Sequence, residues 1–266
     1  MFTLGTLTLA CVFAPFVSPI NPDHQDLLNT FGPAVYNFAS PHWLGTDEFG
    51  RDIFTRILYA GRISLTVGLL STLVVVTVGS LVGVIAGFFG GWADTILMRF
   101  VDLLFSLPTL PILLVASRML SQFLPTMAVI IVVLSLLGWL GISRLVRGSV
   151  LALRGLDFVE ATRALGAGNT RIIFRHLLPN ALAPIIVAAT LAVGDFILTE
   201  SALSFLGFGI QPPTASWGNM LADVNDYFLE HPFLAFYPGI AILLTVISIN
   251  FMGDGLRDAL DPRLKM

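Results

Sequence analysis

The sequence predicts an all-α integral membrane protein with about six transmembrane helices, and three observations support this. Of the 266 residues, 56% are hydrophobic and 12% are charged, and the mean hydropathy is +0.87. Soluble domains carry about 25% charged residues. Apolar runs recur along the chain, most of them close to the about 20 residues that a helix needs to cross a bilayer. The 14 Lys and Arg residues gather mainly between these runs.

Six segments are apolar enough to be spans, although two of them are irregular. The first starts at the first methionine with no basic residue before it, which disfavours a cleaved signal peptide without excluding one. The third is short and contains Pro108 and Pro111, which neighbouring helices can accommodate. The expected spans are residues 2–17, 63–89, 103–116, 127–142, 181–199 and 234–251.

The distribution of basic residues predicts the orientation. Ten of the 14 Lys and Arg residues lie between the second and third spans, between the fourth and fifth, or after the sixth. Short cytoplasmic loops are rich in Lys and Arg. This side is therefore expected to be the cytoplasm, with both termini inside, and segment 211–232, which has no Lys or Arg, is expected outside.

The long segment before the second span has a helical pattern of its own. In "GRDIFTRILYAGRISL" the apolar residues Ile53, Phe54, Ile57 and Leu58 alternate with polar ones. Such a pattern is typical of a helix lying in the membrane interface. The expected organisation is residues 1–62 (first span, external loop and interfacial elbow helix) and residues 63–266 (transmembrane domain, with a cytoplasmic loop at 154–180).

Several functions lack the residues they need. The only lysine, Lys265, is next to the last residue, which excludes the lysine-containing phosphate loop of many ATPases. The single cysteine, Cys11, excludes a disulfide framework and a cysteine-based metal site. The four histidines have no ligand spacing, and a net charge of −3 does not attract nucleic acid. No catalytic, cofactor or metal site is therefore expected in this chain.

Residues 160–180, "EATRALGAGNTRIIFRHLLPN", differ from their apolar surroundings. Gly166 and Gly168 permit a sharp change of direction, and Pro179 is typical of a helix start. The pattern predicts two short helices joined by glycines on the cytoplasmic surface. A basic loop that only follows the positive-inside rule is the alternative.

The spacing in this loop resembles the EAA loop of binding-protein-dependent ABC importers. That loop has E-A-A, three residues, G, nine residues and then I-x-L-P, and here Thr162 and His176 replace the second alanine and the isoleucine. The matching residues are Glu160, Ala161, Gly166, Leu178 and Pro179.

Four further motifs look like the C-type permease subunit of dipeptide, oligopeptide and nickel importers. They are "HWLGTDEFGRDIFTRILYAGRISLTVG", "GFFGGWADTILMRFVDLLFSLP", "SALSFLGFGIQPPTASWGNML" and "NFMGDGLRDALDPR". The resemblance implies the type I ABC importer transmembrane fold and an EAA coupling helix docked on an ATPase. It also implies as partners a homologous B-type permease subunit, two ATPase subunits that bind ATP and Mg, and an extracytoplasmic substrate-binding protein.

The same resemblance implies roles for residues of the coupling loop. Glu160 would pair with a cation of the ATPase and Arg163 and Arg171 with its carboxylates, while small and apolar residues fill its groove. The residues expected to couple to the ATPase are Glu160, Ala161, Arg163, Ala164, Leu165, Gly166, Arg171 and Pro179.

Two acids in or near the fifth span are candidates for the translocation path. Asp195 and Glu200 would be costly in a bilayer unless they face a cavity or a partner, so each either lines the path or is a buried structural carboxylate. A secondary transporter driven through these acids is a rival hypothesis, but it leaves the EAA-like loop unexplained. A membrane-embedded enzyme lacks a readable catalytic group.

The substrate is the least determined feature. Peptide and nickel importers share most of these motifs, and the "RHLLPN" ending together with Glu200 favours peptides. The segment "QPPTASWGNML" would either close the external mouth or meet the substrate-binding protein.

Two local features are expected to serve packing. Gly79, Gly83 and Gly87 form a small-residue face that permits close helix contact. Arg99 is at a helical spacing that would let it pair with Asp94 or Asp102.

Overall fold

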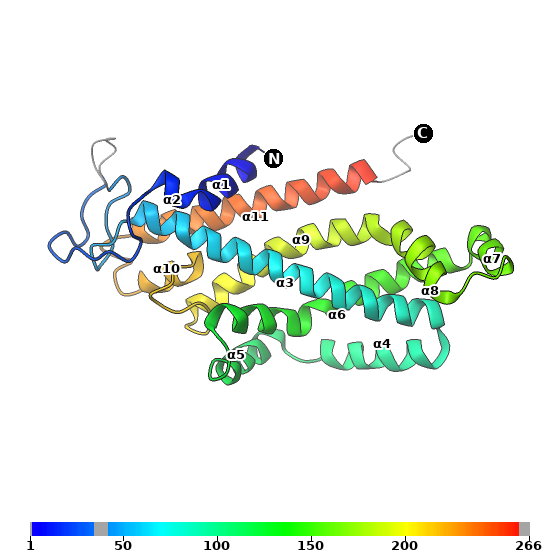
Figure 1. Cartoon of the computed structure of the whole chain (residues 1–266). Coiled ribbons are helices and arrows are strands. Elements are labelled where there is room, and N and C mark those ends of the chain that lie inside the picture. The colour runs from blue at the N-terminus through cyan, green and yellow to red at the C-terminus, as the bar shows by residue number, and fades with distance from the viewer. Residues whose placement is uncertain (1, 35–41, 261–266) are drawn as a thin grey trace. The chain divides into compact units, whose positions relative to one another are not determined.

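The described part of the chain is built from helices (Figure 1). The computed structural model describes residues 2–34 and 42–260, in which no β-strand forms and the only strand-like feature is an isolated bridge between Thr46 and Asp52. This confirms the all-α prediction. The elements are α1 (Phe2–Val12), α2 (Ala14–Val17), α3 (Ile53–Phe89), α4 (Gly91–Phe105), α5 (Thr109–Leu120), α6 (Thr126–Arg154), α7 (Asp157–Ala164), α8 (Asn169–Ile172), the π-helix η1 (Ile173–Leu177), α9 (Leu178–Phe205), α10 (Trp217–Asp223) and α11 (Phe233–Leu260).

Four helical stretches in the described residues are long and apolar enough to cross a membrane. They are α3, α6, the run from α8 to the end of α9, and α11. A fifth span results if α4 and α5, which meet at an angle of 89°, count as one broken span. Pro108 lies in this break, in agreement with the expected interruption of the third span.

The first expected span, residues 2–17, forms two short helices instead of one. Helix α1 has 11 residues and α2 has four, and the helical pattern breaks at Phe13. Pro15 lies in the first turn of α2 and has no N–H to continue the hydrogen-bond pattern of α1. By its length, α1 falls short of the about 20 residues that cross a bilayer.

The expected elbow helix does not form a separate element. Residues 53–62 are the first turns of α3, which continues without a break to Phe89. Ile53 and Leu58 are buried, and so are the polar residues Thr55 and Arg56 between them. Because protein covers the apolar and the polar side of this segment, it is a packed helix end and not an amphipathic helix facing lipid.

The chain forms two compact units, and α3 and α9 each contribute to both. Unit 1 consists of residues 1–69, 117–131 and 194–249, and unit 2 of residues 70–116, 132–193 and 250–266. These boundaries differ from the expected division at residue 62, because helices far apart in sequence pack together within each unit.

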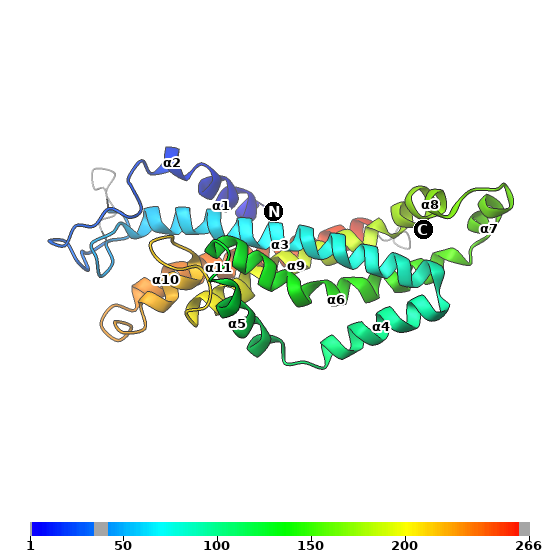
Figure 2. The same ribbon diagram turned by 60° about the horizontal axis from the view of Figure 1, so that its bottom comes forward.

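In unit 2, α3 packs closely against α6 through glycines, and the two helices run side by side in both views (Figures 1 and 2). A Cβ atom on Gly79 would lie 2.7 Å from the Ile142 side chain, and one on Gly83 would lie 2.5 Å from the Ser143 carbonyl oxygen. A Cβ atom on Gly87 would also meet α6. The predicted packing role of this small-residue face is confirmed.

Ion pairs join α4 to α6 in the same unit. Both carboxylate oxygens of Asp94 accept hydrogen bonds from the Arg147 guanidinium. Arg144 Nη2 donates to Asp102 Oδ1 at 2.6 Å. The expected pairing with Arg99 is therefore wrong, because the acids of α4 face the arginines of α6 while Arg99 is exposed.

Helix packing in unit 2 predicts opposite effects for two glycine substitutions. Gly83→Ala is expected to destabilise the protein by about 1–3 kcal/mol, because its Cβ atom would overlap the backbone of α6. Gly148→Ala on α6 is the control, since nothing lies within 4 Å of its Cβ position. Alanine favours a helix by about 0.5–1 kcal/mol over glycine, so this control should be neutral or stabilising. Thermal unfolding in detergent measures both, and equal melting temperatures for the two variants would contradict the packing.

Candidate functional site

The predicted coupling loop consists of two short helices with a glycine turn between them. Helix α7 begins with Asp157 and Glu160 in its first turn, where acids interact favourably with the helix dipole. It ends in a glycine motif: Gly166 has φ +82°, its N–H donates to the Arg163 carbonyl, and Ala167 N–H donates to the Thr162 carbonyl. These two bonds satisfy carbonyls at the helix end, and α8 starts three residues later.

One side of this loop is anchored and the other is free. Val159, Ile172 and Leu177 are fully buried. Leu165, at the turn, is 89% exposed, and Phe174 is 58% exposed. The eight residues predicted for coupling are all exposed: Glu160, Ala161, Arg163, Ala164, Leu165, Gly166, Arg171 and Pro179.

The loop leads directly into a long helix. The π-helix η1 connects α8 to α9, and Pro179 is the second residue of α9. Proline fits here because the first turn of a helix needs no N–H at this position. Asn180 Nδ2 donates to the His176 carbonyl at 2.6 Å across the junction. A single helical run thus extends from the coupling loop to Phe205.

The two acids predicted for the translocation path lie in different environments on α9. Asp195 is exposed, whereas Glu200 is fully buried. Ser64 Oγ of α3 donates to Glu200 Oε2 at 3.0 Å, and Ser204 Oγ donates to Oε1 at 2.6 Å. Both carboxylate oxygens of Glu200 therefore have protein partners.

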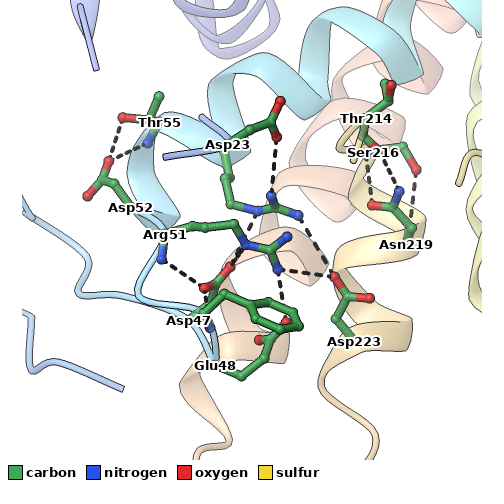
Figure 3. A network of polar contacts seen from close by, with 12 residues as sticks. Asp23, Asp47, Glu48, Arg51, Asp52, Thr55, Thr214, Ser216, Asn219 and Asp223 are labelled. Atoms are coloured by element: carbon green, nitrogen blue, oxygen red, sulfur yellow. Dashed lines mark hydrogen bonds and ion pairs between the residues drawn. The ribbon is translucent and has the colours of Figure 1, made fainter. Parts of the chain in front are cut away.

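A second polar site, which the sequence analysis did not identify, lies in unit 1 (Figure 3). The Arg51 side chain is 7% exposed; its Nε donates to Asp47 Oδ2 at 2.6 Å and its Nη2 to Glu48 Oε1 at 2.9 Å. Asp223 of α10 lies 3.7 Å from the same Nη2. The guanidinium thus joins the start of α3 to the end of α10.

Arg56 is the less well satisfied member of this cluster. Its side chain is 2% exposed, and its nearest carboxylate oxygen, on Asp47, is 3.5 Å from Nε. Asp223 and Asp23 are 3.8 Å from Nη2 and Nη1, and Nη1 makes no hydrogen bond. Arg56 is therefore held by the charges around it and not by short hydrogen bonds.

The carboxylates of the cluster are costly to keep ionised. Burial raises the pKa of Glu48, and the neighbouring Asp47 carboxylate raises it further. Burial also raises the pKa of Asp223, against the lowering effect of Arg56 and Arg51. Three acids face two arginines, so the arginines do not fully compensate the buried negative charge.

A signal for this cluster was present in the sequence. Residues 47–56, "DEFGRDIFTR", carry five charges in a chain with very few, and an amphipathic helix was the simpler interpretation. Asp223, 167 residues after Arg56, has no local signal. Within residues 2–34 and 42–260, no group of three or more His, Cys, Asp or Glu side chains is arranged to hold a metal ion.

Comparison with known proteins identifies relatives over the full length of the chain. Residues 79–266 match the family described as binding-protein-dependent transport system inner membrane component. The glutathione transport system permease protein of Pectobacterium atrosepticum is 41% identical over 268 residues, covering 100% of this chain and 86% of that protein. The dipeptide transport system permease protein of Bacillus subtilis is 42% identical, covering 100% and 81%.

A solved structure has a similar fold. A chain of the methionine ABC transporter in an inward-facing conformation superposes with a TM-score of 0.65 at 18% identity, covering 79% of this chain and 98% of that one. This likeness supports the type I importer architecture and concerns the fold alone.

The charge cluster predicts an unusual pH dependence. The folded pKa of Glu48 lies above its ordinary value of 4.5, so the folded protein binds this proton more tightly than the unfolded chain. The contribution of Glu48 to stability should therefore increase as the pH falls through the raised pKa, and level off below 4.5. Glu48→Gln should raise the melting temperature at neutral pH, by about 2–4 °C per kcal/mol, and weaken the pH dependence.

The control for this experiment is Glu230→Gln, which removes an exposed carboxylate. Thermal unfolding of the three proteins in detergent across the acid range gives the comparison. Melting curves of Glu48→Gln that follow those of the wild type at every pH would contradict the assigned penalty.

Proposed function

The chain belongs to the family of binding-protein-dependent transport system inner membrane components, and we propose that it is the permease subunit of an ATP-driven importer of di- or oligopeptides. The observation that carries the substrate class is its 41–42% identity, over its whole length, to permeases named for glutathione and a dipeptide. Glutathione is itself a tripeptide. In this role the chain forms part of a path across the membrane and catalyses no covalent step.

ATP and Mg are bound by two separate ATPase subunits, and the single lysine of this chain supports that division of work. A homologous B-type permease subunit completes the path, and an extracytoplasmic protein delivers the substrate. The basic residues near α7 and α8 support a cytoplasmic location for the coupling loop and for both termini. On this orientation, the connections at residues 18–52 and 206–216 face outward.

The coupling loop receives the motion of the ATPase. Its exposed residues combine charges at Glu160, Arg163 and Arg171 with the apolar side chain of Leu165, which is 89% exposed. A large exposed apolar side chain beside charged groups is typical of a docking surface with an apolar centre and a polar rim. Gly166 sets the angle between α7 and α8 through its positive φ of 82°.

Asp195 is the candidate for the path itself. It is exposed on α9, whereas Glu200 is satisfied by serines of its own unit. An exposed carboxylate in a membrane span favours a water-filled cavity, where it would attract the amino terminus of a peptide. Asp195→Asn should therefore weaken uptake of peptides more than it weakens assembly.

Uptake in a strain deleted for this gene tests the function. Labelled dipeptides, oligopeptides and nickel ions are supplied in parallel, and only peptide uptake is expected to fall and to be restored by the wild-type gene. Loss of nickel uptake alone would reassign the substrate to a metal, and no change for any compound would refute the peptide assignment.

Gly166→Val tests the coupling step in the same assay. Valine is strained at a positive φ by about 1–3 kcal/mol, and nothing lies within 4 Å of the Cβ position, so the effect acts on the backbone of the turn and not on packing. The variant should insert normally, keep ATP hydrolysis and lose most uptake, and Glu160→Lys should behave similarly. Gly168→Ala is the matched control, because Gly168 has φ −69° and equally open surroundings. Wild-type uptake by Gly166→Val would refute the coupling role.

A further inference from the structure

We propose that Glu200 is a positioning residue that fastens the α9–α10 connection (residues 206–216) and the start of α10 to helices α3 and α9, so that this connection moves together with α9 during transport. The proposal rests on the proposed function for its place in the transport cycle, while its geometric basis lies entirely within unit 1.

Two hydrogen-bond chains end on the Glu200 carboxylate. In the first, the Trp217 backbone N–H donates to Ser64 Oγ at 3.3 Å, and Ser64 Oγ donates to Glu200 Oε2 at 3.0 Å. In the second, the Ile210 N–H donates to Ser204 Oγ at 3.0 Å, and Ser204 Oγ donates to Glu200 Oε1 at 2.6 Å. The carboxylate thus holds, through one serine on each side, both ends of the connection.

A carboxylate is the side chain that this arrangement requires. Each serine hydroxyl accepts a backbone N–H and uses its single proton as a donor, so both atoms that it meets on residue 200 must be acceptors. A carboxylate offers two acceptor oxygens, whereas the amide of glutamine offers one oxygen and one donor nitrogen. Glutamine would therefore preserve one chain and force the serine of the other to give up its donor bond.

Close packing holds the connection against the same two helices. A Cβ atom on Gly218 would lie 2.5 Å from Ser201 Cα, and one on Gly209 would lie 2.4 Å from Ser204 Cα. Trp217 is fully buried, and its Nε1 donates to the Ile57 carbonyl of α3 at 3.0 Å. The connection therefore lies directly on the helices, with no space for side chains or water at these contacts.

The connection is also stiff internally. Ser216 and Asn219 form a capping box at the start of α10. The Asn219 amide Nδ2 donates to the Ile210 carbonyl at 3.2 Å and to the Thr214 carbonyl at 2.7 Å. Since these bonds close the loop on itself, a displacement at Ile210 or Trp217 is transmitted to the whole connection.

Chain continuity relates this site to the coupling loop. Helix α9 starts immediately after η1 and ends at Phe205, so Glu200 and Ser204 lie in the last turns of the helix that leaves the coupling loop. A movement of α9 that follows ATP binding would thus be passed to residues 206–216 through Glu200. The role is mechanical, and Glu200 needs no contact with the substrate.

The experiment compares Glu200→Leu, Glu200→Gln and Ser64→Ala with the control Thr199→Ala. Thr199 precedes Glu200, and its hydroxyl donates to the Asp195 carbonyl within α9, outside the two chains. Every protein carries Cys11→Ala and Thr214→Cys, which place one thiol on the exposed part of the connection. The complexes with their ATPase and partner permease subunits are purified in lipid nanodiscs and matched for amount.

The readout is the rate of maleimide labelling at residue 214, without nucleotide and with ATP plus vanadate. In the Thr214→Cys parent and in Thr199→Ala, the rate should change with nucleotide. In Glu200→Leu, labelling should be at least about tenfold faster and independent of nucleotide, with basal ATP hydrolysis retained and peptide uptake lost. Glu200→Gln and Ser64→Ala, which disturb one chain each, should be intermediate.

A purely structural role would lower the amount of assembled complex and leave the labelling rate of each complex and its nucleotide response unchanged, which would overturn the proposal. A nucleotide-independent rate in the Thr214→Cys parent would also overturn it. If Glu200→Leu fails to assemble, the same criteria apply to the two milder variants. Failure of the wild type to import peptides would refute the proposed substrate and leave the labelling comparison intact.

Discussion

Buried polar groups need partners inside the protein, and in unit 1 this requirement determines how the connections between helices fold. Glu200 is fully enclosed by apolar helices, and its two oxygens are satisfied by Ser64 and Ser204. An unsatisfied buried carboxylate would be far more costly than a buried amide. The serines that supply these bonds also accept backbone N–H groups of residues 210 and 217, so the solution found for one side chain fixes the path of a whole loop.

The charge cluster of unit 1 follows the same requirement at the other end of α10. Arg51 and Arg56 are almost fully buried and draw Asp47, Glu48 and Asp223 around them. Because removing one partner of such a pair leaves an uncompensated charge, clusters of this kind hold their segments in one arrangement even where they add little net stability. They join residues 47–56 to α10, which is more than 160 residues away in the sequence.

Unit 2 is organised differently, because its central contact is made by small residues. Gly79, Gly83 and Gly87 let α3 approach the backbone of α6, and arginines of α6 then pair with Asp94 and Asp102 of α4. The polar coupling loop follows α6 directly, with Val159 and Ile172 buried and its charged residues exposed. Its fold depends on one positive-φ glycine and two backbone hydrogen bonds, which makes it a compact element suited to transmitting force.

Much of this could be predicted from the sequence, because the signals involved are local. The apolar runs predicted the long helices α3, α6, α9 and α11 to within a few residues at many of their ends, and Pro108 predicted the break between α4 and α5. Gly166 and Gly168 predicted a turn between two short helices. The predictions failed where a segment looked self-sufficient: residues 53–62 have the pattern of an interfacial helix, yet buried partners make them the start of α3.

The sequence by itself determined that the chain is an α-helical membrane protein with a polar, glycine-jointed loop, because hydropathy, charge distribution and glycine spacing act over short stretches of chain. Only the tertiary structure decided which polar groups meet. The partners of Arg56, Glu200 and Asp94 lie between 9 and 167 residues away, and no periodicity or spacing encodes such distances. They meet because buried charges and hydroxyls must find one another when the apolar surfaces around them close.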